Sequence, residues 1–244
     1  VSIANRPTIS HVIEQFPEDC EFVIALGYKG KLVQDFLELT YPDKIFYFKQ
    51  VNPFEGIKSG LGLSLLACEE YLQEPFVFIS CDTLVKGEVK KPDHNWMGYT
   101  KIDDLSQYRT LSIEKNIVKE ICEKGIIKEN IHAYIGLAGV YDFKLFWNKM
   151  HTDNFDAIKQ GESYAMRSLI FDSEVLAYKF EWFDTGNLKA LEKTRKAYIE
   201  TNSPNILEKK NEAIWFIGDR VVKYSDDKSF ITNRVKRVLE LKGY

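Results

Sequence analysis

Two aspartates, Asp82 and Asp184, stand in settings that suit the binding of a metal ion. Asp82 follows the mainly apolar run 76–80, and Asp184 lies within the segment 182–186 (Trp-Phe-Asp-Thr-Gly). Each carboxylate therefore follows a run that can be buried and stands on a turn that can face a cleft. Carboxylate oxygens are the hard ligands that Mg²⁺ prefers. Together the two residues predict one shared Mg²⁺ site, although either aspartate alone is more typical of a turn or a helix N-cap.

Other residues have the chemistry that nucleotide binding requires. Gln50 follows the strand-like run 45–49, and its amide offers the donor and the acceptor that recognition of a base edge needs. Further on, small residues open a helix-like segment, where glycine lets a ligand approach the backbone and free N–H groups attract anions. These small residues are Gly60, Gly62 and Ser64. Taken alone, each feature is weak evidence, because small residues in loops and glutamines at strand ends are common.

Two later segments combine charged, small and aromatic residues. Glu123 and Lys124 form an adjacent pair of opposite charge, followed by Gly125. Gly139 and Tyr141 lie in a later strand-like run. An adjacent Glu-Lys pair is commonly a solvated strand end, and an aromatic residue in such a run can equally belong to the core. These segments therefore gain functional meaning only together with the motifs before them.

In their order along the chain, these motifs resemble those of the sugar-phosphate nucleotidyltransferases over roughly residues 5–200. That family joins a nucleoside triphosphate to a phosphorylated sugar or small alcohol and releases pyrophosphate, with Mg²⁺ as the cofactor. The resemblance implies an α/β fold of the nucleotide-diphospho-sugar transferase type, which is Rossmann-like. It also implies Asp82 and Asp184 as catalytic metal ligands, Gln50, Gly60, Gly62 and Ser64 as nucleotide-binding residues, and Glu123, Lys124, Gly139 and Tyr141 as acceptor-binding residues.

The sequence departs from the family's pattern in two main places. Gly125 stands where the family has the proline of Glu-Lys-Pro. Residues 1–7 do not resemble the glycine-rich loop with its arginine and the Pro-Lys pair that grip the triphosphate. Either a preceding segment supplies that loop or the protein lacks it. We favour the first explanation, because the strand before the loop would lie in the middle of the sheet and its loss would expose two neighbours. We expect residues 1–244 alone to turn over weakly.

Composition excludes several other classes. The 244 residues are 45% hydrophobic and 14% aromatic, which is enough for a large core, and the net charge of −3 with a pI near 5.9 argues against nucleic acid or an anionic membrane as partner. The four cysteines show no metal-site spacing and are typical of a reduced cytoplasmic protein. No apolar run approaches the ~20 residues that span a bilayer. Small anionic substrates fit best.

Helix-like and strand-like segments alternate through the first two-thirds of the chain, which predicts a mainly parallel central sheet sandwiched by helices. We expect a nucleotidyltransferase-like domain over residues 1–200 and a polar linker over 201–212. Residues 213–244 predict a hairpin and a helix that resemble the start of a choline- or aminoglycoside-kinase small lobe. Lys223 then stands at the place of the lysine that contacts ATP phosphates, although an exposed structural lysine is an equal alternative.

Three alternatives stay open beside an active nucleotidyltransferase. The chain can be a catalytically silent homologue that binds a nucleotide sugar in a regulatory role, or the nucleotidyltransferase half of a bifunctional kinase/nucleotidyltransferase. A glycosyltransferase of related fold ranks last, because residues 81–84 (Cys-Asp-Thr-Leu) lack an Asp-x-Asp motif. The sequence leaves the nucleobase, the acceptor and the oligomeric state open, a homo-oligomer included.

Overall fold

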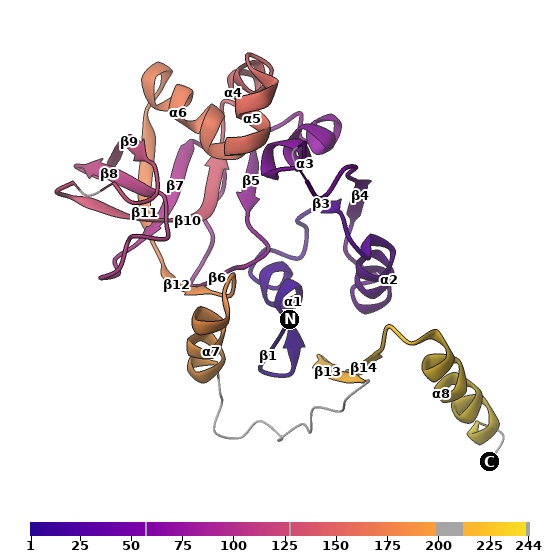
Figure 1. The fold of residues 1–244 in the computed structure, drawn as a ribbon. Helices are drawn as coiled ribbons and strands as arrows, with labels where there is room; N and C mark the ends of the chain where they lie inside the picture. The colour runs from indigo at the N-terminus through magenta and orange to yellow at the C-terminus, as the bar shows by residue number, and fades with distance from the viewer. Residues whose placement is uncertain (57, 127, 199–211, 243–244) are drawn as a thin grey trace.

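The computed structural model describes residues 1–56, 58–126, 128–198 and 212–242 (Figure 1). The N-terminal third alternates short strands and helices, as the sequence pattern predicts. Its elements are β1 (Ser2–Ile3), β2 (Arg6–Pro7), α1 (Thr8–Ile13), β3 (Phe22–Leu26), α2 (Gly30–Thr40), β4 (Phe46–Gln50), α3 (Leu61–Cys68), the short 3-10 helix η1 (Glu69–Tyr71) and β5 (Phe76–Ile79).

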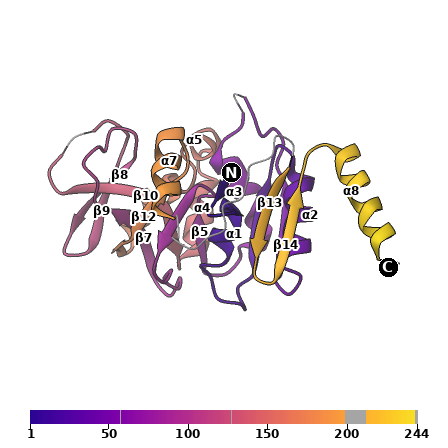
Figure 2. The same ribbon diagram turned by 90° about the horizontal axis from the view of Figure 1, so that it is seen from below.

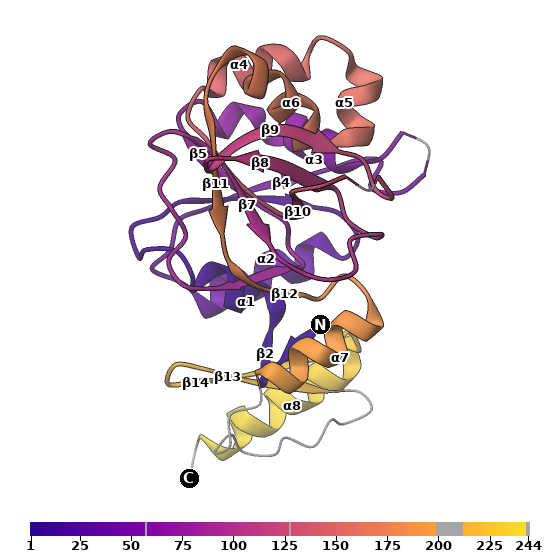
Figure 3. The ribbon, with the colours of Figure 1, turned by 90° about the vertical axis from the view of Figure 1, so that its left-hand side faces the viewer.

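The largest sheet has six strands in the order β5-β10-β7-β11-β9-β8. The strands not yet introduced are β7 (Asn95–Thr100), β8 (Thr110–Glu114), β9 (Ile117–Cys122), β10 (Ile131–Val140) and β11 (Val175–Lys179). Strand β10 pairs with β5, β7 and β8, and it lies within the strand layer seen in Figure 3. A separate pair, β3 with β4, is parallel.

The predicted α/β fold with a central sheet and covering helices is confirmed, but its strand directions need a correction. Among the described strands, only β3–β4 and β7–β11 are parallel pairs, and every pairing of β10 is antiparallel. One cause is the tight turn between β8 and β9, where Lys115 and Asn116 have φ of 49° and 64° and reverse the chain. The sequence pattern did not predict the return of the long strand β10 beside β5.

Helices α3 to α6 cover one face of the six-stranded sheet, and α1 and α2 lie on the other side of the strands (Figures 1 and 3). The helices of the first group that follow β10 are α4 (Phe143–Met150), α5 (Asn154–Gln160) and α6 (Glu162–Asp172). Apolar side chains at helical spacing, such as Phe146 and Met150 in α4 and Met166 and Leu169 in α6, are fully buried against the sheet. This core fixes the strand ends from which the site is built.

The C-terminal hairpin is joined to the N-terminal region. Strands β13 (Ala213–Ile217) and β14 (Arg220–Tyr224) place Trp215 edge-on against Phe36 of α2, with ring centroids 5.3 Å apart. The Trp215 Nε1 donates to Ser2 Oγ at 2.9 Å. Helix α8 (Lys228–Leu241) has no buried residue and projects away from the body (Figure 2). The predicted hairpin and helix are thus present, while the predicted linker, except for Glu212, lies outside the described residues. Within the described chain, no helix is long and apolar enough to cross a membrane.

Candidate functional site

Strand register brings Asp82 and Asp184 together. After β5 the chain makes a turn in which the Thr83 amide donates to the Ser80 carbonyl at 3.0 Å, and it continues as β6 (Thr83–Lys86). This strand pairs antiparallel with β12 (Glu181–Asp184), with Asp184 directly opposite Thr83. Asp184 therefore lies beside the turn that carries Asp82, although 101 residues separate them in the chain.

Both carboxylates face Gly186, which follows β12. A Cβ atom on Gly186 would lie 2.7 Å from Asp82 Oδ2 and 3.2 Å from Asp184 Oδ1. The two oxygens therefore border one small space that the missing side chain leaves free. The neighbouring Thr185 ties the two segments together, because its amide and its hydroxyl both donate to the Asp82 carbonyl, at 3.1 and 3.0 Å. Two acidic oxygens, one from the turn after β5 and one from the end of β12, thus converge on one point.

The Asp184 side chain is held by donors on both oxygens. The Gly186 amide donates to Oδ1 at 2.8 Å, and the Tyr108 hydroxyl donates to Oδ2 at 2.9 Å. Asn187 Nδ2 adds a longer contact of 3.3 Å to Oδ2, while its Oδ1 caps helix α7 (Leu188–Ala197). Burial, then the hydrogen bond to Asp184, raises the pKa of Tyr108 to about 12. Tyr108 is therefore a neutral donor at physiological pH, and it orients Asp184.

The site suits a divalent cation. Partial burial raises the pKa of Asp82, a backbone hydrogen bond offsets part of the rise, and the nearby Asp184 charge adds to it. A cation between the carboxylates would relieve both the desolvation and the repulsion. No cluster of three or more His, Cys, Asp or Glu occurs among the described residues, so the two aspartates would hold an ion with substrate or water oxygens as its other ligands. The chemistry of the donor set fits Mg²⁺.

Gln50 lies at the carboxyl end of β4, an edge position at which open parallel sheets bind ligands. It pairs in register with Leu26 of β3, and its amide nitrogen makes long contacts of 3.4 Å to the carbonyls of Gly27 and Val51. A Cβ on Gly30 would lie 2.8 Å from Gln50 Oε1, so this glycine makes room for the amide. Gln50 is exposed and only loosely held, which leaves it free to contact a ligand.

The glycines that begin α3 have a packing role in this structure. A Cβ on Gly60 would lie 2.3 Å from the Ile158 carbonyl oxygen, and one on Gly62 would lie 1.9 Å from the Ala157 carbonyl oxygen. Both positions therefore require glycine for the close approach of α5, whether or not a nucleotide binds there. The Ser64 amide donates to the Gly60 carbonyl at 3.3 Å and closes the first turn of α3.

Glu123 lies between two arginines, Arg109 and Arg167. Burial alone would raise the pKa of Glu123, but the charges of the two arginines and their hydrogen bonds outweigh it and hold the pKa below its usual value. Lys124 beside it is exposed. Gly125 has φ of 81°, a left-handed conformation that proline cannot adopt. The loop therefore differs in backbone conformation from a Glu-Lys-Pro turn.

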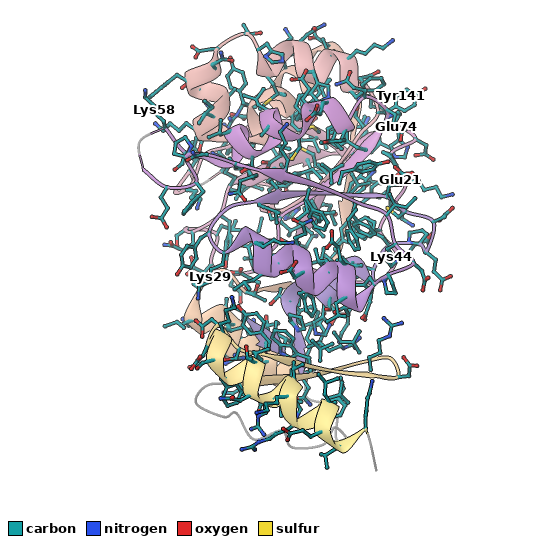
Figure 4. The ribbon with its side chains drawn as sticks, turned by 90° about the vertical axis from the view of Figure 1, so that its right-hand side faces the viewer. Glu21, Lys29, Lys44, Lys58, Glu74 and Tyr141 are labelled. Carbon is teal, nitrogen blue, oxygen red and sulfur yellow. The ribbon has the colours of Figure 1, made fainter. Side chains whose placement is uncertain are left out.

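The register of β10 separates Gly139 and Tyr141 from the two aspartates. Gly139 pairs with Val77 and Val140 with Phe76, so Tyr141 lies at the start of β5, whereas Asp82 follows its end. Figure 4 shows Tyr141 close to Glu74, which precedes β5. A Cβ on Gly139 would lie 2.0 Å from the indole nitrogen of Trp96, which explains the glycine by packing. These two predicted acceptor residues lie at the other end of the sheet.

Sequence reasoning missed several residues that build the aspartate pair. Gly136 has φ of 68° at an irregularity in β10, and a Cβ there would lie 2.6 Å from Ser80 Oγ, beside the turn of Asp82. A glycine inside an apolar strand is a signal for such an irregularity. Tyr108 and Thr185 gave no comparable signal, because their roles depend on partners that are distant in the sequence.

No family model matches the sequence, and no curated protein matches it. Solved structures do match. An apo UDP-glucose pyrophosphorylase is 17% identical with a TM-score of 0.65, covering 81% of this chain and 88% of that one. The CTP:phosphocholine cytidylyltransferase of Streptococcus pneumoniae is 16% identical with a TM-score of 0.61, covering 81% and 87%. The inositol-1-phosphate CTP transferase of T. maritima is 14% identical with a TM-score of 0.61, covering 82% and 86%. The chain therefore shares the fold of these nucleotidyltransferases.

Proposed function

We propose that this chain is a Mg²⁺-dependent nucleotidyltransferase that joins a nucleoside triphosphate to a phosphorylated sugar or small alcohol and releases pyrophosphate. The observation that carries the proposal is the convergence of Asp82 Oδ2 and Asp184 Oδ1 on Gly186. The shared fold supports it, because the neighbours bear the names of enzymes for UDP-glucose, phosphocholine and inositol 1-phosphate. A cytoplasmic location remains part of this proposal.

In the proposed reaction, an oxygen of the acceptor phosphate attacks the α-phosphorus of the nucleotide. The new P–O bond forms as the bond from the α-phosphorus to the bridging oxygen breaks, and pyrophosphate leaves with that electron pair. The bound Mg²⁺ would neutralise charge that gathers on the phosphates. The chain's own contribution is to fix the ligands: Asp82 through the Thr185 contacts to its carbonyl, and Asp184 through Tyr108 and the Gly186 amide.

We also propose that Gln50 and the turn of Gly60, Gly62 and Ser64 contact the nucleotide. Gln50 is exposed at a strand end, and the first turn of α3 offers amides that can face an anion. Gly60 and Ser64 are half-buried and could contact a ligand directly, whereas Gly62 is buried and would contribute by letting α5 approach this turn. The nucleobase stays open, since an amide can pair with several base edges.

The C-terminal hairpin bears on the bifunctional alternative. Lys223 lies 3.9 Å from the buried Glu212, and the hairpin packs on α2 through Trp215. If this hairpin belongs to a kinase small lobe of a larger parent protein, that lobe either packs on α2 as it does here or detaches from it. The other alternative is a catalytically silent regulatory protein, or sensor, that binds a nucleotide sugar. A measurement of turnover distinguishes it from the enzyme.

The proposal is tested by incubating the full-length protein with Mg²⁺, each of the four NTPs and a set of sugar and alcohol phosphates, and by measuring pyrophosphate release. Mg²⁺-dependent nucleotide binding to residues 1–244 is measured as well. Asp184→Asn is expected to weaken Mg²⁺-dependent binding about 100-fold, since one carboxylate ligand is lost. If no NTP gives pyrophosphate release and no NTP shows Mg²⁺-dependent binding, the proposed enzyme activity is rejected. Binding without turnover in the full-length protein would favour the sensor.

A further inference from the structure

The C-terminal hairpin and the loop that follows it contact both ends of helix α2. At the start of the helix, Asp226 Oδ2 lies 2.8 Å from Lys29 Nζ. At its end, Arg220 Nη1 donates to the carbonyls of Leu39 and Thr40, at 3.2 and 3.3 Å. In Figure 4, Lys29 lies just above the start of α8, which begins two residues after Asp226. These contacts bracket α2 from one end to the other.

The lengths and the charges of the two segments match. Arg220 and Asp226 are six positions apart in the chain, which spans up to about 20 Å when the chain is extended. Helix α2 has 11 residues and is about 16 Å long. The start of a helix carries a partial positive charge and its end a partial negative charge, so Asp226 and Arg220 each oppose the helix charge beside them.

Apolar packing holds the hairpin in this place. Trp215 and Ile217 of β13 are buried in the same core cluster as Phe36 and Leu37 of α2. The Phe216 amide adds a hydrogen bond of 3.2 Å to the Asn5 carbonyl in the N-terminal region. Because this packing fixes the hairpin against α2, the contacts at the two helix ends form at defined points.

The turn that begins α2 borders Gln50, the residue that we propose contacts the nucleotide. The Gly30 amide donates to the Gly27 carbonyl at 3.0 Å, and within this turn Lys29 has φ of 55°. Gln50 Nε2 lies 3.4 Å from the Gly27 carbonyl, and a Cβ on Gly30 would lie 2.8 Å from Gln50 Oε1. The nitrogen and the oxygen of the Gln50 amide both lie beside this turn. A shift of residues 27–30 would therefore change the position of the amide.

Lys29 stands at an unfavourable place for a cation. It precedes the first helical residue of α2, where free amides carry partial positive charge, and no side chain of the described residues caps that end. The hydrogen bond to Asp226 raises the pKa of the Lys29 ammonium and lowers the pKa of the Asp226 carboxyl. Asp226 thus supplies the counter-charge. Because exposed ion pairs contribute little to global stability, the effect of this pair is expected in the local turn.

We propose that the C-terminal hairpin is a positioning element of the nucleotide site, in which Asp226 acts through Lys29 on the turn that borders Gln50. This rests on the proposed function, in which Gln50 contacts the nucleotide. Asp226 and Lys29 are positioning residues and need no contact with the nucleotide themselves. Movement of the hairpin away from α2 then lowers nucleotide affinity, so the C-terminal segment regulates the nucleotidyltransferase-like part of the chain.

A charge swap tests the ion pair in residues 1–244, with Mg²⁺-dependent NTP binding measured by calorimetry. We expect affinity to fall about threefold in Asp226→Asn, which removes the counter-charge, and about fivefold in Lys29→Asp, which sets two carboxylates against each other. Aspartate tolerates the left-handed φ at this position. Lys29→Asp combined with Asp226→Lys restores an ion pair, and we expect its affinity to return to within about twofold of the wild-type value. If the swap restores nothing, Lys29 contacts the nucleotide itself and the positioning role is overturned.

Asp35→Asn is the matched control. It removes the same charge and breaks a comparable exposed pair on α2, in which Asp35 Oδ1 lies 2.7 Å from Lys31 Nζ, but it leaves the turn at Lys29 intact. Its NTP affinity should equal that of the wild-type chain. A fall as large as that of Asp226→Asn would mean a general effect of charge or of helix stability, and it would overturn the inference. Circular dichroism establishes that each variant is folded.

Amide hydrogen exchange without nucleotide separates this inference from the proposed function. The Leu32 and Val33 amides donate to the Lys29 carbonyl at 2.9 and 3.4 Å, so they report on the turn. Their exchange should rise about threefold in Asp226→Asn and stay unchanged in Asp35→Asn. Unchanged exchange in Asp226→Asn would overturn the positioning role, whatever the nucleotide affinity. Raised exchange in a chain that binds no NTP would instead overturn the proposed function, and with it the nucleotide role of the hairpin.

Discussion

Two polar clusters lie at opposite ends of β5. They differ in how many of their polar groups have hydrogen-bond or charge partners within the protein. At the end of β5, Asp82 and Asp184 bring two acidic oxygens together without a cation from the described chain. At its start, the buried Asn95 donates to Asp142 and Ser173, at 2.6 and 3.0 Å, and accepts from the Tyr141 and Asp142 amides at 2.9 and 3.1 Å.

The comparison distinguishes polar groups that stabilise the fold from polar groups that are available to a ligand. Asn95 uses both its donors and its acceptor on the protein itself, so its cluster contributes to stability and leaves nothing for a ligand. The aspartate pair keeps like charges close together and partly desolvated, which costs stability in the absence of a cation. Unfavourable charge at a strand end is the feature that marks the proposed binding site. Polarity alone does not mark it.

Breaking the satisfied cluster should give the largest effect. Asn95→Ala leaves the Tyr141 and Asp142 amides without their acceptor in a buried place, and we expect a loss of about 3 kcal/mol in the free energy of unfolding. Chemical denaturation measures it. Asn148→Ala, at an exposed position in α4, is the control and should change stability by less than about 0.5 kcal/mol. Equal losses in the two variants would show that the Asn95 cluster is not structural.

A side chain at Gly186 should have the opposite effect at the aspartate pair, because it should weaken Mg²⁺ binding and leave folding stability nearly unchanged. Gly186→Ala places a methyl group 2.7 Å from Asp82 Oδ2, so the carboxylates must move apart, and we expect Mg²⁺ affinity to fall about tenfold, or ~1.4 kcal/mol. Calorimetric titration with Mg²⁺ and an NTP measures this. Its folding stability should change little, because Gly186 has no left-handed φ.

Gly87→Ala is the matched variant for that experiment. Gly87 has open space around it, but its φ of 100° strains any other residue. We expect Gly87→Ala to lose stability and to keep its Mg²⁺ affinity. If Gly186→Ala keeps full affinity, or if Gly87→Ala loses affinity as well, then the space at Gly186 is not the ion site.

The comparison also shows which parts of the molecule were visible in the sequence. The apolar run before Asp82 indicated β5, because burial and strand pattern are local properties, whereas Asp184 was expected on a turn and is the last residue of β12. The resemblance placed the two residues in one site, and the pairing of β6 with β12 brings them together. By contrast, Tyr141 was assigned to the acceptor by motif order alone, and the direction of β10 moves it to the other end of β5.

Strand direction and side-chain partners were not visible, because both depend on contacts between distant segments. Gly60 and Gly62 read as ligand-binding positions, yet their clearest constraint is α5, nearly a hundred residues later. Arg109 and Arg167 stand in no motif, and only the fold brings both to Glu123. Sequence patterns therefore located the strands and the two aspartates, while the residues that surround them depend on tertiary contacts that the sequence does not show.

The smallest predicted effect is on folding stability, and it comes from the burial of the Asp82 carboxylate and its repulsion by Asp184. Because the folded protein raises the pKa of Asp82, it binds that proton more tightly than the unfolded chain does. The contribution of this proton to the free energy of unfolding is fully present at pH values below the pKa of Asp82 in the unfolded chain, near 4. It is lost as the pH rises through the pKa of Asp82 in the folded protein. At neutral pH without metal, the ionised carboxylate therefore costs stability, and Mg²⁺ should restore it.

Asp82→Asn removes that ionisation, so at pH 7 in EDTA we expect the free energy of unfolding to rise by about 0.5 kcal/mol, a small gain because the residue is exposed and solvent screens it. The gain should vanish below pH 4 and in saturating Mg²⁺ with an NTP, which stabilises only the wild-type chain. Denaturation curves over this pH range measure it. Asp142→Asn in the satisfied cluster should give no gain. A gain there as well would mean that net charge, and not the pairing of Asp82 with Asp184, sets the effect, since both substitutions remove one negative charge from a chain that already carries −3.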